Sequence, residues 1–109
     1  MGAYNTLNVN VKCRNCSRLY KSNLQFKFGD IWQHEYKLDD AVILEDKSLN
    51  NSNYVVYGIL EDSVCLYCGY FNPDEYDIFV IRGQIKRYSI NEDINLYLGK
   101  NEGNYYEIR

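Results

Sequence analysis

Apolar and polar residues alternate strictly near the start of the chain. In the stretch TLNVNVKC, Leu7, Val9 and Val11 are separated by polar side chains. A period of two residues is typical of a strand that buries one face. We therefore predict a strand here that leads directly into the first pair of cysteines, which begins at Cys13.

A second alternating run, LQFKF, is followed by the turn residues GD and then by IWQHEYKL. This order predicts an antiparallel hairpin. A three-residue loop pairs Phe28 with Trp32 and gives the hairpin one apolar face. In that register Leu24 lies opposite Tyr36, whereas a two-residue loop would set apolar residues against polar ones. We therefore expect the three-residue loop, with a bulge.

The rest of the chain also shows strand patterns. The run YVVYGILED predicts a strand at 54–61, YDIFVI and QIKRYSI predict a hairpin that turns at 82–83, and INLYL with NYYEI predicts another around GKNEG. Residues 41–44 suggest a short buried strand, and the Asn- and Ser-rich stretch 48–53 suggests an exposed loop. No segment has a clear 3.6-residue apolar period, so we expect little helix.

Composition supports this interpretation. A chain of 109 residues is expected to form one domain, residues 1–109, because two would each lack a core of useful size. With 46% hydrophobic and 25% charged residues, the chain is not of the disordered type. Its 12 tyrosines favour strands, because aromatic side chains suit a half-buried pleated surface. The predicted fold class is therefore mostly β.

The acidic balance limits the choice of partners. The net charge is −3 and the sequence pI is about 5.1, so the molecule as a whole repels polyphosphate. A basic protein is a better match than nucleic acid. No apolar run approaches the roughly 18 residues that span a bilayer, and no secretory leader opens the chain. We expect a cytoplasmic protein with no membrane partner.

The chain has four cysteines, arranged as two C-x-x-C motifs, CRNC and CLYCG. Thiolates are ligands that zinc prefers, and four of them make a closed tetrahedral site with a structural role. The predicted ligands of one structural Zn²⁺ are Cys13, Cys16, Cys65 and Cys68. The 48 residues between the motifs exceed the common zinc-site spacing, so this insert must itself be structured. The predicted architecture is a zinc-ribbon-like core with extended antiparallel hairpins.

Two other uses of the cysteines remain open at this point. Disulfides suit small secreted proteins, and a reducing cytoplasm argues against them. A redox pair of the thioredoxin type needs C-x-x-C at the start of a helix that follows a strand, and neither motif has that setting.

Few other residues suggest chemistry. His34 is the only histidine, and its aromatic neighbours indicate a packed, hydrogen-bonded residue and not a general base. With no nucleophile to spare, we expect no enzymatic activity. The tyrosines exceed what a small core needs, which points to a protein interface. The excess comprises Tyr54, Tyr57, Tyr67, Tyr70, Tyr76, Tyr88, Tyr97, Tyr105 and Tyr106.

A local basic group near the first cysteine pair supports an alternative function. It consists of Lys12, Arg14, Arg18 and Lys21. Such a group can contact backbone phosphates, so a nucleic-acid-associated zinc ribbon is the alternative that we keep.

The segment QFKFGDIWQHEYKLDD, between CRNC and CLYCG, resembles a segment of small bacterial zinc-ribbon proteins with a QFK-aromatic-GD-x-W-Q pattern. The resemblance implies a cysteine-only zinc site and says little about activity. By size and charge, the chain is similar to bacterial immunity and antitoxin proteins. The expected function is a zinc-stabilised protein-protein interaction module, an immunity- or antitoxin-type inhibitor of a basic toxin or nuclease.

Overall fold

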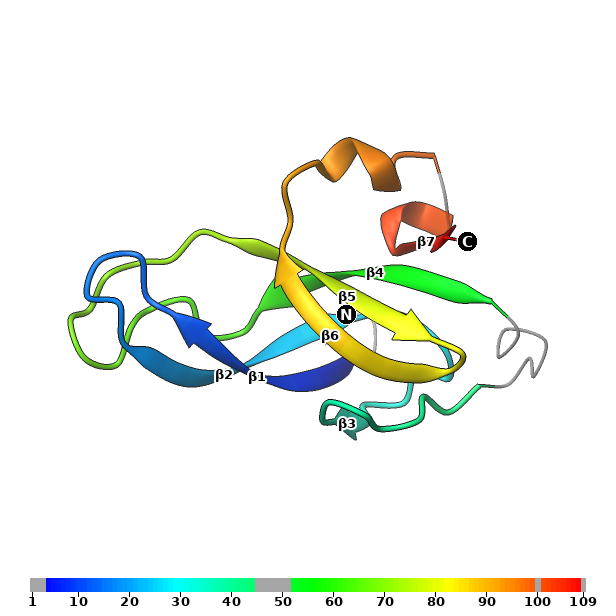
Figure 1. The fold of residues 1–109 in the computed structure, drawn as a ribbon, viewed down its shortest axis with the longest axis horizontal. Helices are drawn as coiled ribbons and strands as arrows, with labels where there is room; N and C mark the ends of the chain where they lie inside the picture. The colour runs from blue at the N-terminus through cyan, green and yellow to red at the C-terminus, as the bar shows by residue number, and fades with distance from the viewer. Residues whose placement is uncertain (1–3, 45–51, 100, 109) are drawn as a thin grey trace.

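The computed structural model describes residues 4–44, 52–99 and 101–108, in which seven strands form one sheet and two short 3₁₀ helices lie near the C-terminus (Figure 1). The elements are β1 (Asn5–Lys12), β2 (Leu19–Phe26), β3 (Glu35–Tyr36), β4 (Asn53–Leu60), β5 (Glu75–Ile81), β6 (Gln84–Ile90), η2 (Ile94–Tyr97), η3 (Asn101–Gly103) and β7 (Tyr105–Ile108). The prediction of a mostly β fold is confirmed.

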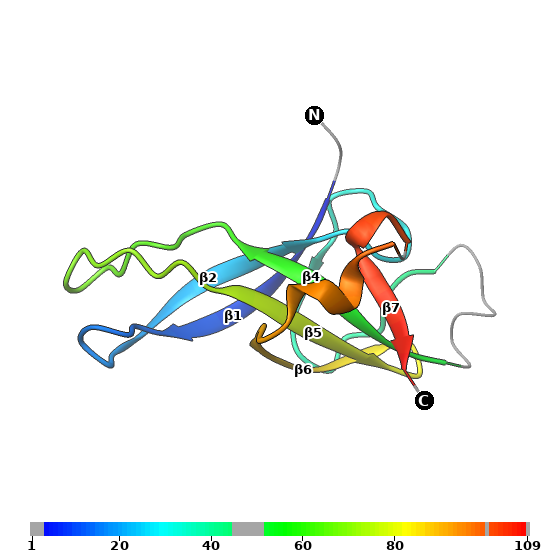
Figure 2. The same ribbon diagram turned by 90° about the horizontal axis from the view of Figure 1, so that it is seen from above.

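Two long hairpins dominate the architecture. Strands β1 and β2 pair antiparallel along their whole length and end at Lys12 opposite Leu19. Strands β4 and β5 pair antiparallel in the same way. The loop of each hairpin carries one cysteine motif, and the two loops lie together at one end of the molecule, away from η2 (Figures 1 and 2).

The core lies inside the curl of this sheet. The strand order β3-β1-β2-β4-β5-β6 rolls the inner faces toward one another, so that Leu7 and Val9 of β1 and Ile78 of β5 belong to the same buried cluster. The predicted alternation in β1 is confirmed, since its odd-numbered residues are buried. A fully buried side chain of this kind contributes about 1.5–3 kcal/mol through removal from water.

The hairpin predicted between Leu24 and Tyr36 is wrong. Strand β2 pairs with β1, and β3 pairs parallel with β1, where Leu7 lies opposite Tyr36. The buried side chain of Asn5 explains the difference: it donates to the carbonyl of Phe28 at 3.2 Å and accepts from the amide of His34 at 3.0 Å. These bonds fold the intervening chain into an irregular loop.

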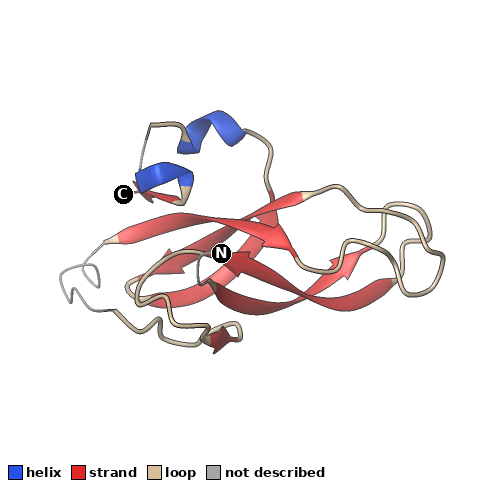
Figure 3. Cartoon of the chain, turned by 180° about the vertical axis from the view of Figure 1, so that it is seen from behind, coloured by secondary structure: helices blue, strands red, loops and turns tan. Residues whose placement is uncertain are grey.

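The second hairpin predicted near the C-terminus is also wrong. The residues INLY form η2, because the Asp93 carboxylate accepts a hydrogen bond from the Asn95 amide at 3.0 Å and caps a short helical turn. Strand β7 pairs with β4, with Tyr106 opposite Val55, and the helices lie above this part of the sheet (Figure 3). The short strand predicted at 41–44 is reduced to a single bridge between Ala41 and Gln84.

Other local predictions agree with the structure. The turn at Arg82 and Gly83 has two positive φ angles, 49° and 80°, as a tight hairpin requires, and it joins β5 to β6. The strand expected at 54–61 is β4. Most of the loop predicted at 48–53 lies outside the described residues. Among those that are described, no helix has the length and apolar character needed to cross a membrane.

Candidate metal centre

The two cysteine loops, residues 13–18 and 65–70, share one backbone structure. In the first loop the amide of Cys13 donates to the carbonyl of Arg18 at 3.0 Å. In the second loop the amide of Cys65 donates to the carbonyl of Tyr70 at 2.9 Å. The equivalent residues are 52 positions apart in the chain, so the hairpins present their cysteines in the same way.

Each loop turns through one residue in the left-handed region. Ser17 has a φ of 64° and Gly69 a φ of 74°, and each amide donates to the carbonyl of the first cysteine in its loop at 3.0 Å. Ser17 and Gly69 each follow the second cysteine of a motif, and they adopt the same backbone conformation. The strain at Ser17 costs about 1–2 kcal/mol, which the glycine avoids.

The four sulfur atoms converge on one point. Cys13 Sγ lies 3.6 Å from Cys68 Sγ, Cys16 Sγ lies 3.6 Å from Cys65 Sγ, and all four lie within 4.8 Å of one another. A tetrahedron with metal–sulfur bonds of about 2.3 Å has edges of about 3.8 Å. A disulfide needs about 2.05 Å, and all four cysteines are free. The geometry fits one ion bound by four thiolates, and this donor set favours zinc.

Backbone and side-chain amides point at the sulfur atoms. The amide of Asn15 donates to Cys13 Sγ, and the amide of Tyr67 donates to Cys65 Sγ, both at 3.4 Å. The side chain of Asn15 also reaches across to Cys68 Sγ at 3.5 Å. Such hydrogen bonds stabilise thiolates and orient them toward a metal.

The thiols differ in acidity before a metal binds. Burial raises the pKa of Cys13, but hydrogen bonds from the amides of Cys16 and Asn15 outweigh it and bring the pKa to about 6. At Cys16 a hydrogen bond from the Arg18 amide lowers the pKa, while burial and the neighbouring sulfur atoms together raise it to about 11. The first thiolate that forms in the cluster therefore makes ionisation of the next thiol less favourable.

Metal binding is therefore expected to depend on pH. At pH 7 the thiol of Cys16, with a pKa of about 11, is protonated and must release its proton to bind. Below pH 6 the thiol of Cys13 must also lose a proton, so the affinity should fall more steeply with acidification there. Calorimetry in buffers of different ionisation enthalpy would measure the protons released with each zinc. A metal affinity that does not change with pH would contradict four-thiolate binding.

A buried asparagine joins the two loops. Asn72 is fully buried, accepts from the amide of Arg14 at 2.9 Å and donates to the carbonyls of Ser63 and Tyr70 at 3.4 Å. Next to it, the guanidinium of Arg14 forms an ion pair with Asp74. This role could not be predicted from the sequence, because an asparagine beside a proline is typical of any loop.

No protein-family model, curated protein or solved structure matches this chain. The predicted membership of a zinc-ribbon family is thus not established. What supports the metal site is the convergence of the two C-x-x-C motifs in the structure.

The other residues singled out in the sequence lie elsewhere. His34 Nε2 is 3.2 Å from a carboxylate oxygen of Asp30, and the histidine is not part of the cysteine cluster. This agrees with a hydrogen-bonded, packed histidine. Trp32, expected on the apolar face of the predicted hairpin, is 76% exposed.

Most of the surplus tyrosines serve packing. Tyr54 lies 5.0 Å from Phe28, and Tyr97 lies 5.0 Å from Tyr106, measured between ring centroids. Of the nine tyrosines named from the sequence, only Tyr67 and Tyr70 are classed as exposed. The interface interpretation therefore applies chiefly to the second cysteine loop.

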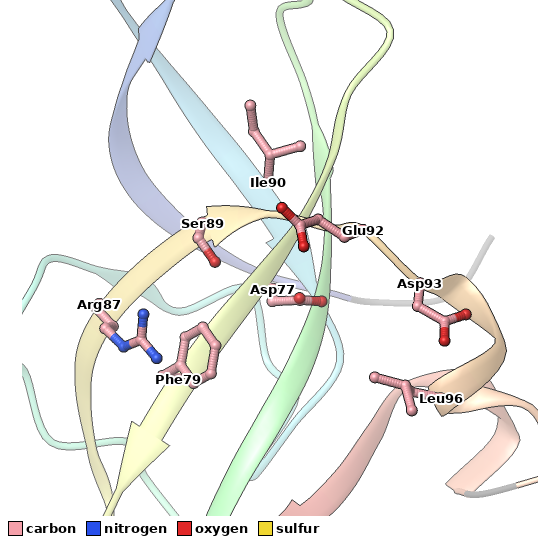
Figure 4. A pocket seen from close by; sticks show the side chains of 8 residues that line it. All are labelled: Asp77, Phe79, Arg87, Ser89, Ile90, Glu92, Asp93 and Leu96. Atoms are coloured by element: carbon pink, nitrogen blue, oxygen red, sulfur yellow. The ribbon is translucent and has the colours of Figure 1, made fainter.

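A cleft of about 500 Å³ lies between the β5–β6 hairpin and η2 (Figure 4). Its lining consists of Asp77, Phe79, Arg87, Ser89, Ile90, Glu92, Asp93 and Leu96. The guanidinium carbon of Arg87 lies 3.8 Å from the centre of the Phe79 ring. The cleft thus combines three carboxylates with one guanidinium that rests on an aromatic ring.

Proposed function

We propose that this chain is a zinc-stabilised protein-protein interaction module without catalytic activity. The observation that carries the proposal is the convergence of four sulfur atoms within 4.8 Å, from two loops far apart in the sequence. A site filled by four thiolates leaves no position for water or substrate, which supports a structural ion. The ion would hold the two hairpin ends in place for binding.

The partner that we propose is a basic protein, a toxin or nuclease that this chain inhibits in the manner of an immunity protein or antitoxin. The net charge of −3 and the excess of carboxylates in the cleft support this choice. A lysine or arginine of the partner would enter the cleft beside Glu92 and Asp93. Opposite charges on two proteins also speed their encounter.

A nucleic-acid-associated role has weaker support. Arg14 is paired with Asp74, and the guanidinium carbon of Arg18 lies 5.1 Å from the centre of the Tyr67 ring. Of the four cations near the first loop, two are thus already engaged, whereas phosphate binding depends on cations that are free to replace counterions.

A short arginine-rich peptide is the probe that tests the proposal. In a nuclear magnetic resonance titration of the zinc-loaded protein, we expect shifts of the amides around Glu92, Asp93 and Leu96. The Glu92→Gln/Asp93→Asn variant should weaken this binding by about tenfold. A matched control is Glu35→Gln, an exposed carboxylate of β3 that does not line the cleft.

Two outcomes would contradict the partner assignment. Peptide binding that the cleft variant leaves unchanged would place the basic partner elsewhere. Salt-sensitive binding of a single-stranded oligonucleotide, reduced by Lys12→Glu/Lys21→Glu, would favour the nucleic-acid alternative. Neither outcome bears on the metal, whose presence native mass spectrometry tests by one zinc mass per chain.

A further inference from the structure

Large apolar side chains are exposed on the hairpin that carries the second cysteine loop. Leu66 is 71% exposed and Phe71 is 61% exposed, and residues 63–73 contain no charged side chain. The apolar loop face comprises Val64, Leu66, Tyr67, Tyr70 and Phe71, each at least 41% exposed. Exposed apolar residues that are scattered singly are normal on a protein surface, whereas a group of them marks an interaction site.

The first cysteine loop provides an internal control. Lys12 pairs with Leu19 in the first hairpin, and Val64 pairs with Phe71 at the matching place in the second. The positions equivalent to Val64, Leu66, Tyr67 and Tyr70 are held by Lys12, Arg14, Asn15 and Arg18. The same backbone therefore forms with polar side chains, and the apolar residues of the second loop are not needed for the fold.

Charge is distributed unevenly along this face. At the tip, Arg18 reaches over the ring of Tyr67. At the opposite end, where the loop joins the sheet, Glu61 follows β4 and Glu75 begins β5, and both are exposed. The face thus has a cation at one end and carboxylates at the other. When two copies of the face lie antiparallel, the cation of each copy meets the carboxylates of the other.

We propose that the apolar loop face binds the same face of a second copy of this chain about a two-fold axis. In such an isologous contact each residue meets its partner in reverse order along the face. The axis places the Arg18 end of one copy against the Glu75 end of the other, and the apolar residues meet at the centre. Central apolar residues with a charged rim are the usual anatomy of a protein interface.

This contact adds to the proposed function and does not depend on it. The cleft beside η2 is lined by Asp77 and Phe79 of β5, by β6 and by the residues that follow β6, and it includes none of the residues of the apolar loop face, which precede β5. A two-fold dimer would therefore carry two clefts, one on each copy.

Sedimentation velocity of the zinc-loaded full chain tests the proposal over about three decades of protein concentration. We expect a reversible monomer–dimer equilibrium. Phe71→Ser should raise the dissociation constant about tenfold or more, as removal of a central aromatic residue does. Leu19→Ser is the matched control, since Leu19 holds the equivalent place in the first hairpin and is 60% exposed against 61% for Phe71. This control should leave the equilibrium unchanged.

Charge exchange tests the reversed arrangement. Arg18→Glu and Glu75→Arg should each weaken self-association, and an equimolar mixture of the two variants should restore it, because one copy then supplies each missing charge. Circular dichroism and one zinc per chain would show that every variant is folded.

Three results would overturn the proposal: a monomer at every concentration, a dimer that Phe71→Ser does not weaken, or equal weakening by Leu19→Ser. Binding of a single-stranded oligonucleotide by a monomer, lost in Phe71→Ser, would assign the face to base stacking instead. A monomer that still holds zinc would leave the metal centre and the cleft as proposed.

Discussion

Removal of the metal is expected to unfold this protein. Binding of structural zinc to four thiolates is worth on the order of 10 kcal/mol at neutral pH, and this energy appears as folding energy because the unfolded chain has no preformed site. A domain of this size has a total stability of about 5–15 kcal/mol. Loss of the zinc-binding energy would therefore remove most of the free energy that stabilises the native state.

The arrangement of the hairpins makes this dependence stronger. In the described part of the chain, backbone contacts between these hairpins are few: Leu24 pairs with Leu60, Gln25 pairs with Ile59, and the amide of Glu61 donates to the carbonyl of Asn23 at 2.9 Å. Beyond this point toward the loops, side-chain contacts and the proposed ion must keep the hairpins together. Without the ion, the negative charge that forms in the cysteine cluster would push the loops apart.

Thermal unfolding followed by circular dichroism would check this expectation. A chelator should abolish the cooperative transition, and added zinc should restore it. Cys65→Ser, which removes a buried ligand, should act like the chelator even with zinc present. Leu19→Ser, an exposed change at the same end of the molecule, should unfold at nearly the wild-type temperature. An unchanged transition after complete loss of metal would show that the ion is not structural.

Gly29→Ala is expected to destabilise the protein more than alanine at Gly58, Gly69, Gly99 or Gly103. A Cβ at this position would lie 2.7 Å from the carbonyl oxygen of Ile43 and 2.8 Å from Cγ1 of Val42. The φ of 76° adds strain of about 1–2 kcal/mol, and overpacking adds about 1–3 kcal/mol. We expect a total loss of about 2–5 kcal/mol of unfolding free energy.

Gly69→Ala separates the cost of backbone strain from the cost of overpacking. Gly69 has nearly the same φ, 74°, but a Cβ there would meet no atom within 4 Å. Ser17 already adopts this conformation in the first loop, so the loss should be about 1 kcal/mol. Urea unfolding of both zinc-loaded variants would give the two free energies. Equal losses would mean that crowding around Gly29 is relieved by movement of the 42–44 segment.

Sequence reasoning succeeded where the signal was local. The alternation that ends at Cys13 gave β1, and the Arg82–Gly83 turn gave the β5–β6 hairpin, because each depends on neighbouring residues alone. The cysteine cluster was predicted for a similar reason. The C-x-x-C motif sets the chemistry of each half-site within four residues, and only the meeting of the halves needs the fold.

Sequence reasoning failed where a choice of strand partner decided the outcome. The pattern of Phe28 to Tyr36 fits a hairpin, but β2 has a longer match in β1, and the buried Asn5 amide stabilises the loop that results. Near the C-terminus, Asp93 caps a helical turn in a segment whose composition suits a strand. The role of Asn72 depends on groups from both hairpins, which no local pattern reveals.

Within the described residues, β3 pairs with β1 only at Thr6 and Leu7, and a tyrosine of β6 contacts the open backbone farther along β1. The hydroxyl of Tyr88 on β6 accepts from the amide of Asn10 at 2.9 Å and donates to its carbonyl at 3.4 Å. A phenol thereby fills the place that a neighbouring strand would occupy. Since an open edge is a template for pairing with another chain, this side chain blocks amyloid-like growth at the middle of β1.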